Sequence, residues 1–155
     1  MRASLAVATV GLLLGACSIV NRSIERPTAD VREVAVSSAG FSGVTGELHL
    51  DVANPNGFGV PLHGIDWQLA VGGARAITGS VELAQTIPAR GVAPVTTRLA
   101  IDARDAIAVA QQLAAGARTY QLSARLRFST PIGPLDVDIA HTGQLTDAGG
   151  LFGGL

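Results

Sequence analysis

The segment from Glu47 to Val71 constrains the fold more than any other part of the 155-residue chain. The seven residues at each end of this segment alternate between apolar and polar side chains, which is the period of a strand with one buried face. Between them lies Asn54-Pro55-Asn56, where Pro55 cannot donate a backbone hydrogen bond and Asn side chains favour turns. The segment therefore predicts two half-buried antiparallel strands, separated by a structural break and a loop over residues 57–64.

The same alternation recurs before and after this segment. It predicts about seven strands, at residues 31–36, 47–53, 65–71, 77–83, 92–101, 119–129 and 135–145. Gly72-Gly73 suits a two-residue hairpin turn, and residues 37–46 read as a Gly-rich connection from which Phe41 and Val44 reach the core. Asp102 and Gly116 fit the start and the end of one helix.

These elements predict an all-β chain folded as a β-sandwich of antiparallel strands with one short helix. A parallel α/β fold is excluded, because there is a single helix and the strands have one polar face. A closed barrel remains an alternative. In the last hairpin, Arg125 and Arg127 are expected to lie opposite Asp136 and Asp138.

Composition limits the classes of partner. The chain contains no Lys and its net charge is −1, so it has no long-range field that would attract nucleic acid or anionic lipid. Aromatic residues make up 4%, which leaves few platforms for stacking bases or sugars. At 48% hydrophobic content the chain is able to bury a core and is not of the disordered class.

The N-terminus has the pattern of an export signal. Arg2 is followed by an apolar run from Leu5 to Leu14 that is shorter than the roughly 20 residues needed to span a bilayer. The next residues complete Leu14-Gly15-Ala16-Cys17, which resembles the bacterial lipobox, and this implies cleavage before Cys17 and acylation of its sulfur. Cys17 is the only Cys, so the chain cannot form an internal disulfide. The alternative is an ordinary signal peptide in which Cys17 falls by chance.

This interpretation divides the chain into four parts. We expect a lipoprotein signal peptide at residues 1–16, a lipidated tether at 17–30, a folded domain at 31–145 and a flexible Gly-rich tail at 146–155. The lipid on Cys17 would anchor the protein to a bacterial membrane. Ser18 after the Cys favours the outer membrane, facing the periplasm, over the inner membrane.

The order of motifs resembles the late embryogenesis abundant type 2 family, also called the water stress and hypersensitive response (WHy) domain. The resemblance rests on the strand ending in Asn54-Pro55-Asn56, on Val60-Pro61-Leu62 and on Ile65 to Leu69, and it extends over residues 31–145. It implies an immunoglobulin/fibronectin-III-like β-sandwich with one helix. It also implies that the protein is not an enzyme, needs no cofactor and has a role in desiccation stress.

Few residues suggest a catalytic or metal-binding site. Glu47, His49 and Asp51 share one strand face and form the strongest candidate metal site, but alternation places polar residues there in any strand, so no metal site is predicted. His63 and His141 are isolated in the sequence, and no Gly-x-Ser-x-Gly elbow is present. Asp136 and Asp138 are interpreted as solvated charges rather than a catalytic pair. Two further residues, Phe58 and Phe152, are apolar side chains in Gly-rich segments.

The sequence thus predicts a non-catalytic envelope lipoprotein with a binding or stabilising role under stress. Its predicted site residues are Cys17 for lipid attachment and Asn54, Pro55 and Asn56 as a structural family motif, with no catalytic residue. Two alternatives remain open: an assembly partner of an envelope complex that binds through an exposed strand edge, and a carrier of a small apolar ligand. An envelope hydrolase ranks below both.

Overall fold

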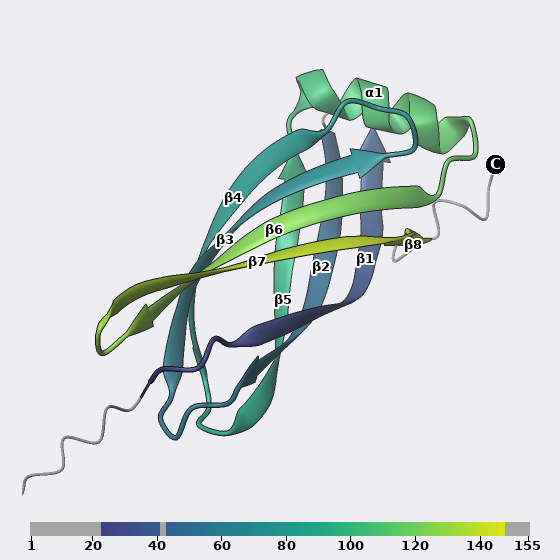
Figure 1. The fold of residues 1–155 in the computed structure, drawn as a ribbon. Coiled ribbons are helices and arrows are strands. Elements are labelled where there is room, and N and C mark those ends of the chain that lie inside the picture. The colour runs from purple at the N-terminus through teal and green to yellow at the C-terminus, as the bar shows by residue number, and fades with distance from the viewer. Residues whose placement is uncertain (1–22, 41–42, 148–155) are drawn as a thin grey trace, which may run out of the picture.

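The computed structural model describes residues 23–40 and 43–147, which form two β-sheets packed face to face with one helix at one end (Figure 1). The strands are β1 (Thr28–Gly40), β2 (Gly43–Asn54), β3 (Val60–Val71), β4 (Ile77–Ile87), β5 (Gly91–Ile101), β6 (Thr119–Thr130), β7 (Gly133–Gln144) and β8 (Thr146–Asp147). The helix α1 covers Ala103–Ala114. Sheet A has the order β5-β2-β1-β8 and sheet B the order β4-β3-β6-β7.

The strand order confirms the predicted sandwich. Neighbouring strands pair antiparallel throughout, apart from the parallel contact between β1 and the two-residue β8. Without β8, three strands of sheet A face four strands of sheet B, as in immunoglobulin-like and fibronectin-III-like domains. The two sheets do not close into a barrel.

The core lies between the sheets, where the apolar side chains of each alternating strand meet. In β2, β5 and β6 every second residue is buried, as the sequence predicts. The largest fully buried side chains come from both sheets: Phe128, Leu48, Leu50, Leu62, Ile65, Ile87, Leu99, Leu122 and Leu126. Burial of this apolar surface is the main force that holds the two sheets together.

Helix α1 closes one end of the sandwich. It buries Ala106, Val109 and Leu113, which recur at helical spacing, and it contacts β1, β2 and β3. Asp102 occupies the N-cap position, but its side chain makes no capping hydrogen bond. Gly116 follows the C-cap residue with φ +90°, and the amides of residues 116 and 117 return to the carbonyls of residues 113 and 112, which is a Schellman ending.

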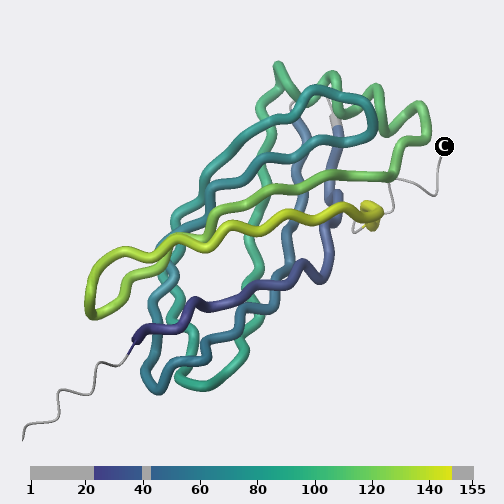
Figure 2. Tube along the Cα trace, in the orientation of Figure 1, coloured from purple at the N-terminus to yellow at the C-terminus, as the bar shows by residue number. Residues whose placement is uncertain are grey.

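Strand direction assigns every connection to one of two ends. The β2–β3, β4–β5 and β6–β7 connections lie at the end where Thr28 opens β1 beside Ala53, and we call this end the N-terminal pole (Figure 2). Helix α1 and the β3–β4 connection lie at the opposite end, the helix pole (Figure 1).

The structure extends four strands beyond their predicted bounds: β2 begins at Gly43 and β4 ends at Ile87, and β1 and β3 change as well. β1 begins at Thr28 and runs to Gly40, so residues 28–30 belong to sheet A rather than to a tether, and most of the predicted 37–46 connection is strand. The register of β1 against β2 shifts twice, and these shifts interrupt the alternation of apolar and polar residues in the β1 sequence. β3 begins at Val60 rather than at Ile65, because a register shift between Leu62 and Gly64 breaks the period while both sides of the shift stay paired.

Three further predictions need comment. Gly72-Gly73 does form a turn, closed by a 3.0 Å hydrogen bond from the Ala74 amide to the Val71 carbonyl, but β4 starts only at Ile77, so the connection has five residues. Thr146 and Asp147 form β8 rather than the start of a flexible tail. Phe41, Phe152 and residues 148–155 lie outside the described residues.

The indole of Trp67 packs directly over Gly79, its cross-strand partner in β4. A Cβ atom at Gly79 would lie 2.2 Å from Cζ2 and 2.5 Å from Cε2 of Trp67. Trp67 is buried, so displacing the ring would disturb the side chains packed around it. The small residue in β4 is therefore required by packing between neighbouring strands.

Replacing Gly79 with Ala should displace this ring. We expect Gly79→Ala to lower the free energy of unfolding by about 1–3 kcal/mol, as overpacking does in other cores, and to shift the emission of the single Trp to the red. Urea unfolding followed by Trp fluorescence measures both effects. Gly73→Ala is the control, because a Cβ there meets nothing within 4 Å. An equal effect of the two substitutions would contradict the packing account.

Candidate functional site

The Asn54-Pro55-Asn56 segment is the most densely hydrogen-bonded part of the N-terminal pole. It ends β2, and the two Asn residues are buried, with 2% and 7% of their surfaces exposed, whereas Pro55 is exposed. A buried amide side chain is costly unless its donors and acceptors are satisfied. The contacts of these two side chains therefore decide what this segment does.

The amide nitrogen of Asn54 faces three backbone carbonyls. Nδ2 lies 2.7 Å from the carbonyl oxygen of Phe58, 3.2 Å from that of Ile87 and 3.1 Å from that of Pro88. Its two hydrogens are shared among these acceptors. On the other side, Oδ1 of Asn54 accepts from the backbone amide and from Nδ2 of Asn56, each at 3.0 Å. Asn54 thus ties the end of β2 to the β2–β3 loop and to the end of β4.

Asn56 extends the same network to the N-terminal segment. Its Oδ1 accepts from the Glu25 amide at 2.9 Å, and its Nδ2 donates to the Glu25 carbonyl at 2.8 Å. Its own carbonyl accepts from the Arg90 amide at 2.9 Å. We call Asn54, Asn56 and the backbone groups they bind the Asn junction. Through it residues 23–27, which the sequence assigns to a tether, are held against the fold.

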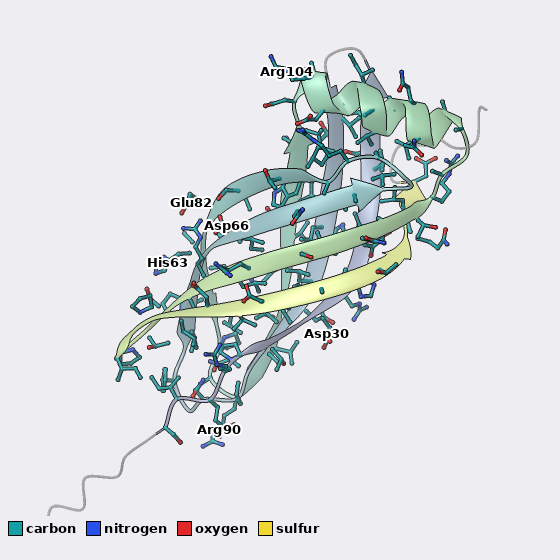
Figure 3. All side chains as sticks on the ribbon, turned by 45° about the horizontal axis from the view of Figure 1, so that its top comes forward. Asp30, His63, Asp66, Glu82, Arg90 and Arg104 are labelled. Carbon is teal, nitrogen blue, oxygen red and sulfur yellow. The ribbon has the colours of Figure 1, made fainter. Side chains whose placement is uncertain are left out.

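Ion pairs cross the outer face of sheet B. Arg125 Nε lies 2.7 Å from Asp138 Oδ1, as predicted, and this hydrogen bond lowers the pKa of Asp138 below its usual value. Arg127 stands opposite Asp136 in the register, but its guanidinium pairs with Asp66 and Glu82 instead. Figure 3 labels these two acidic residues. Exposed pairs of this kind contribute little to stability. Beside these ion pairs lies an open hollow of about 540 Å³, and its lining includes Asp66, Arg125 and Asp138.

The structure does not bring Glu47, His49 and Asp51 together as a metal site. Nε2 of His49 lies 3.4 Å from Glu47, and Nδ1 lies 3.1 Å from the Thr96 hydroxyl. Asp51 pairs with Arg32 at 2.6 Å. Among residues 23–40 and 43–147, no three His, Cys, Asp or Glu side chains are grouped as metal ligands.

The other two His residues lie apart. Nε2 of His63 is 2.7 Å from the Ser129 hydroxyl on the surface, and no described carboxylate pairs with His63 to complete a catalytic triad. His141 lies beside the ring of Tyr120, with 5.9 Å between ring centroids. Burial raises the pKa of Tyr120. Within the described ranges these side chains do not converge on a common site.

The hollow that the described residues leave beneath the helix is small. The apolar hollow beneath α1, lined by residues that include Val36, Leu69 and Val109, has a volume of about 10 Å³. Pockets that bind small ligands typically measure about 300–1,000 Å³. Phe58 packs partly buried against the core, so it is not a free contact residue. Within the described part of the chain, no helix has the length and apolar character that crossing a membrane requires.

Two replacements of Asn54, by Ala and by Asp, test the Asn junction. Asn54→Ala removes the donors to three carbonyls, and we expect the free energy of unfolding to fall by about 2–4 kcal/mol. Asn54→Asp places a carboxylate against the same carbonyls, which raises its folded-state pKa above the unfolded value. Its stability should therefore be highest at acidic pH and fall as pH rises through the folded pKa.

Urea unfolding of both variants across pH measures these effects. The control is Gln68→Ala, which removes an exposed amide from β3 and should cost little. An Asn54→Asp variant as stable as the wild type at neutral pH would show that the donors of Asn54 are not needed.

Comparison with solved structures shows the same fold. An Arabidopsis thaliana protein solved in solution superposes with a TM-score of 0.66 at 18% identity, covering 80% of this chain and 83% of that one. A solution structure described as a candidate late embryogenesis abundant protein gives 0.61 at 21% identity, over 78% and 71% of the two chains. A crystal structure from Archaeoglobus fulgidus gives 0.56 at 11% identity, over 80% and 97%.

Sequence comparison identifies the family. A search of curated proteins finds no matching relative. The family model described as "Late embryogenesis abundant protein" matches residues 49–143, which is more than half of the chain and includes the whole Asn54-Pro55-Asn56 motif. The chain therefore belongs to the late embryogenesis abundant protein family represented by this model.

Proposed function

We propose that the protein is a non-catalytic lipoprotein of the bacterial cell envelope, whose domain binds or stabilises an envelope component during water stress. The observation that carries the proposal is the Leu14-Gly15-Ala16-Cys17 motif, which stands a few residues before Ser23, the first described residue of the domain. Acyl chains on Cys17 would hold the domain at a membrane. Ser18 favours the outer membrane, with the domain in the periplasm.

The arrangement of ionisable groups supports a role without catalysis. Asp51 and Asp138 each pair with an Arg side chain. His49 contacts Glu47 and a Thr hydroxyl, and His63 contacts a Ser hydroxyl. The pKa of Asp138 is shifted down by its Arg partner, which is the opposite of what a general acid at neutral pH requires. Membership in the late embryogenesis abundant family supports the link to stress.

One observation favours the assembly-partner alternative. β7 is the edge strand of sheet B, it is 12 residues long, and β6 is its only neighbour within that sheet. Such an edge can accept an extended segment of another envelope protein as an additional strand. The volume of about 10 Å³ under α1 gives no support to the ligand-carrier alternative, which we do not propose.

Labelling and complementation test the leading proposal together. A deletion strain carries the wild-type gene, Cys17→Ser or the control Ser18→Ala, and grows with radiolabelled palmitate. We expect label on the wild type and on Ser18→Ala but none on Cys17→Ser, because the thiol of Cys17 is the acyl acceptor. The two labelled forms should restore survival after drying, whereas Cys17→Ser should not.

The lipid anchor and the stress role can be contradicted independently of each other. A wild-type protein without label would remove the lipid anchor and with it the localisation. A labelled protein whose deletion changes neither survival of drying nor envelope integrity would remove the stress role and leave the anchor in place.

A further inference from the structure

Two of the three large apolar side chains that the described residues expose stand at the N-terminal pole. Ile132, in the β6–β7 turn, is 83% exposed, and Val92, at the start of β5, is 62% exposed. The third, Ile107, is 60% exposed on α1 at the helix pole. Ile132 and Val92 come from opposite sheets, so this pole presents apolar groups from both halves of the sandwich.

Basic groups accompany these apolar groups. Arg26 and Arg90 line a hollow of about 470 Å³ that also includes Glu25 and Val92. Arg90 has a positive φ of 51°, and its amide bonds to the Asn56 carbonyl, so the Asn junction fixes the backbone that presents it. Figure 3 shows Arg90 at this end of the molecule and Arg104 at the other. Arg with exposed aliphatic side chains is a combination suited to the headgroup region of a bilayer.

The length of chain before Ser23 limits how far this pole can stand from an anchored lipid. Cys17 and Ser23 are six positions apart, and six fully extended residues reach roughly 20 Å. Each strand of 11 to 13 residues spans about 40 Å at the usual rise. The tether therefore keeps the N-terminal pole near the membrane and the helix pole away from it.

From these observations we infer that the N-terminal pole is a membrane-docking surface for anionic phospholipid. Ile132 and Val92 enter the headgroup region. Arg90 binds lipid phosphates, together with the donors of Arg26 other than Nη1, which donates to the Asp136 carbonyl at 3.0 Å. The docked domain stands upright, with α1 directed away from the bilayer. This inference rests on the acylation of Cys17 in the proposed function, and it adds a fixed orientation to the anchor.

A matched pair of probes tests the orientation in the full-length acylated protein. Ala89→Cys in the β4–β5 turn and Ala108→Cys on α1 are both exposed Ala positions, one at each pole. Each is labelled with an environment-sensitive fluorophore, since acylation blocks Cys17, the only native thiol. The protein is reconstituted into vesicles of phosphatidylethanolamine and phosphatidylglycerol in equal parts, containing a lipid with a nitroxide quencher on its headgroup.

We expect strong quenching at position 89 and little at position 108. Ile132→Ser and Arg90→Gln should each reduce quenching at position 89, since full burial of one Ile side chain corresponds to about a tenfold change in an equilibrium constant. Ile107→Ser and Arg104→Gln are the controls at the helix pole, and they should leave quenching unchanged.

Three results would overturn the inference. Equal quenching at the two positions would show that the domain has no preferred orientation. Quenching at position 89 that survives both Ile132→Ser and Arg90→Gln would show that the tether alone brings this pole close. A Cys17 thiol that is free to react with the fluorophore would show that the protein is not acylated, which removes the proposed anchor as well.

Discussion

The N-terminal pole depends on one buried amide. The side chain of Asn54 sits where β2 ends, and its donors face carbonyls of Phe58 in the β2–β3 loop and of Ile87 and Pro88 at the end of β4. Hydrophobic burial holds the two sheets together but is non-directional. The hydrogen bonds of the Asn54 amide are directional. They fix where β2 ends and how the β2–β3 and β4–β5 connections lie against each other. Asn56 then carries the same network to Glu25 and so to the start of the chain's described part.

Alternation in the sequence predicts the sandwich, because each strand has one buried face and the period of two survives wherever the ladder is regular. It fails at β1 and β3, where register shifts near Glu33 and His63 move the apolar residues out of phase. It also misses β8, whose two residues become a strand only because β1 lies beside them. The sequence identifies Asn54 and Asn56 as turn formers. Their partners Ile87, Pro88 and Glu25 stand more than 30 positions away, so no local pattern reveals the whole junction.

The ionisable side chains on the described surface make local contacts and are not gathered at one site. Charged groups on sheet B, such as Arg125 and Asp138, are engaged with each other, and the His residues are spread over different strands. The N-terminal pole exposes Ile132 and Val92, and Arg26 and Arg90 line a hollow there together with Val92, whereas the helix pole exposes Ile107. The Asn junction links this pole to the point where the chain enters the domain. The Asn junction would thereby also set the orientation of the domain on a membrane.

The most direct test of this account is native-state hydrogen exchange of the Glu25 and Asn56 amides, measured by NMR on the folded wild-type protein. Both amides lie outside the strands, and both donate to Asn side chains rather than to a strand partner. If the Asn junction organises the pole, these two amides should exchange as slowly as those of neighbouring strand residues, because they open only when the fold opens. Exchange at the rate of an unstructured peptide, while the strand amides stay protected, would contradict the account.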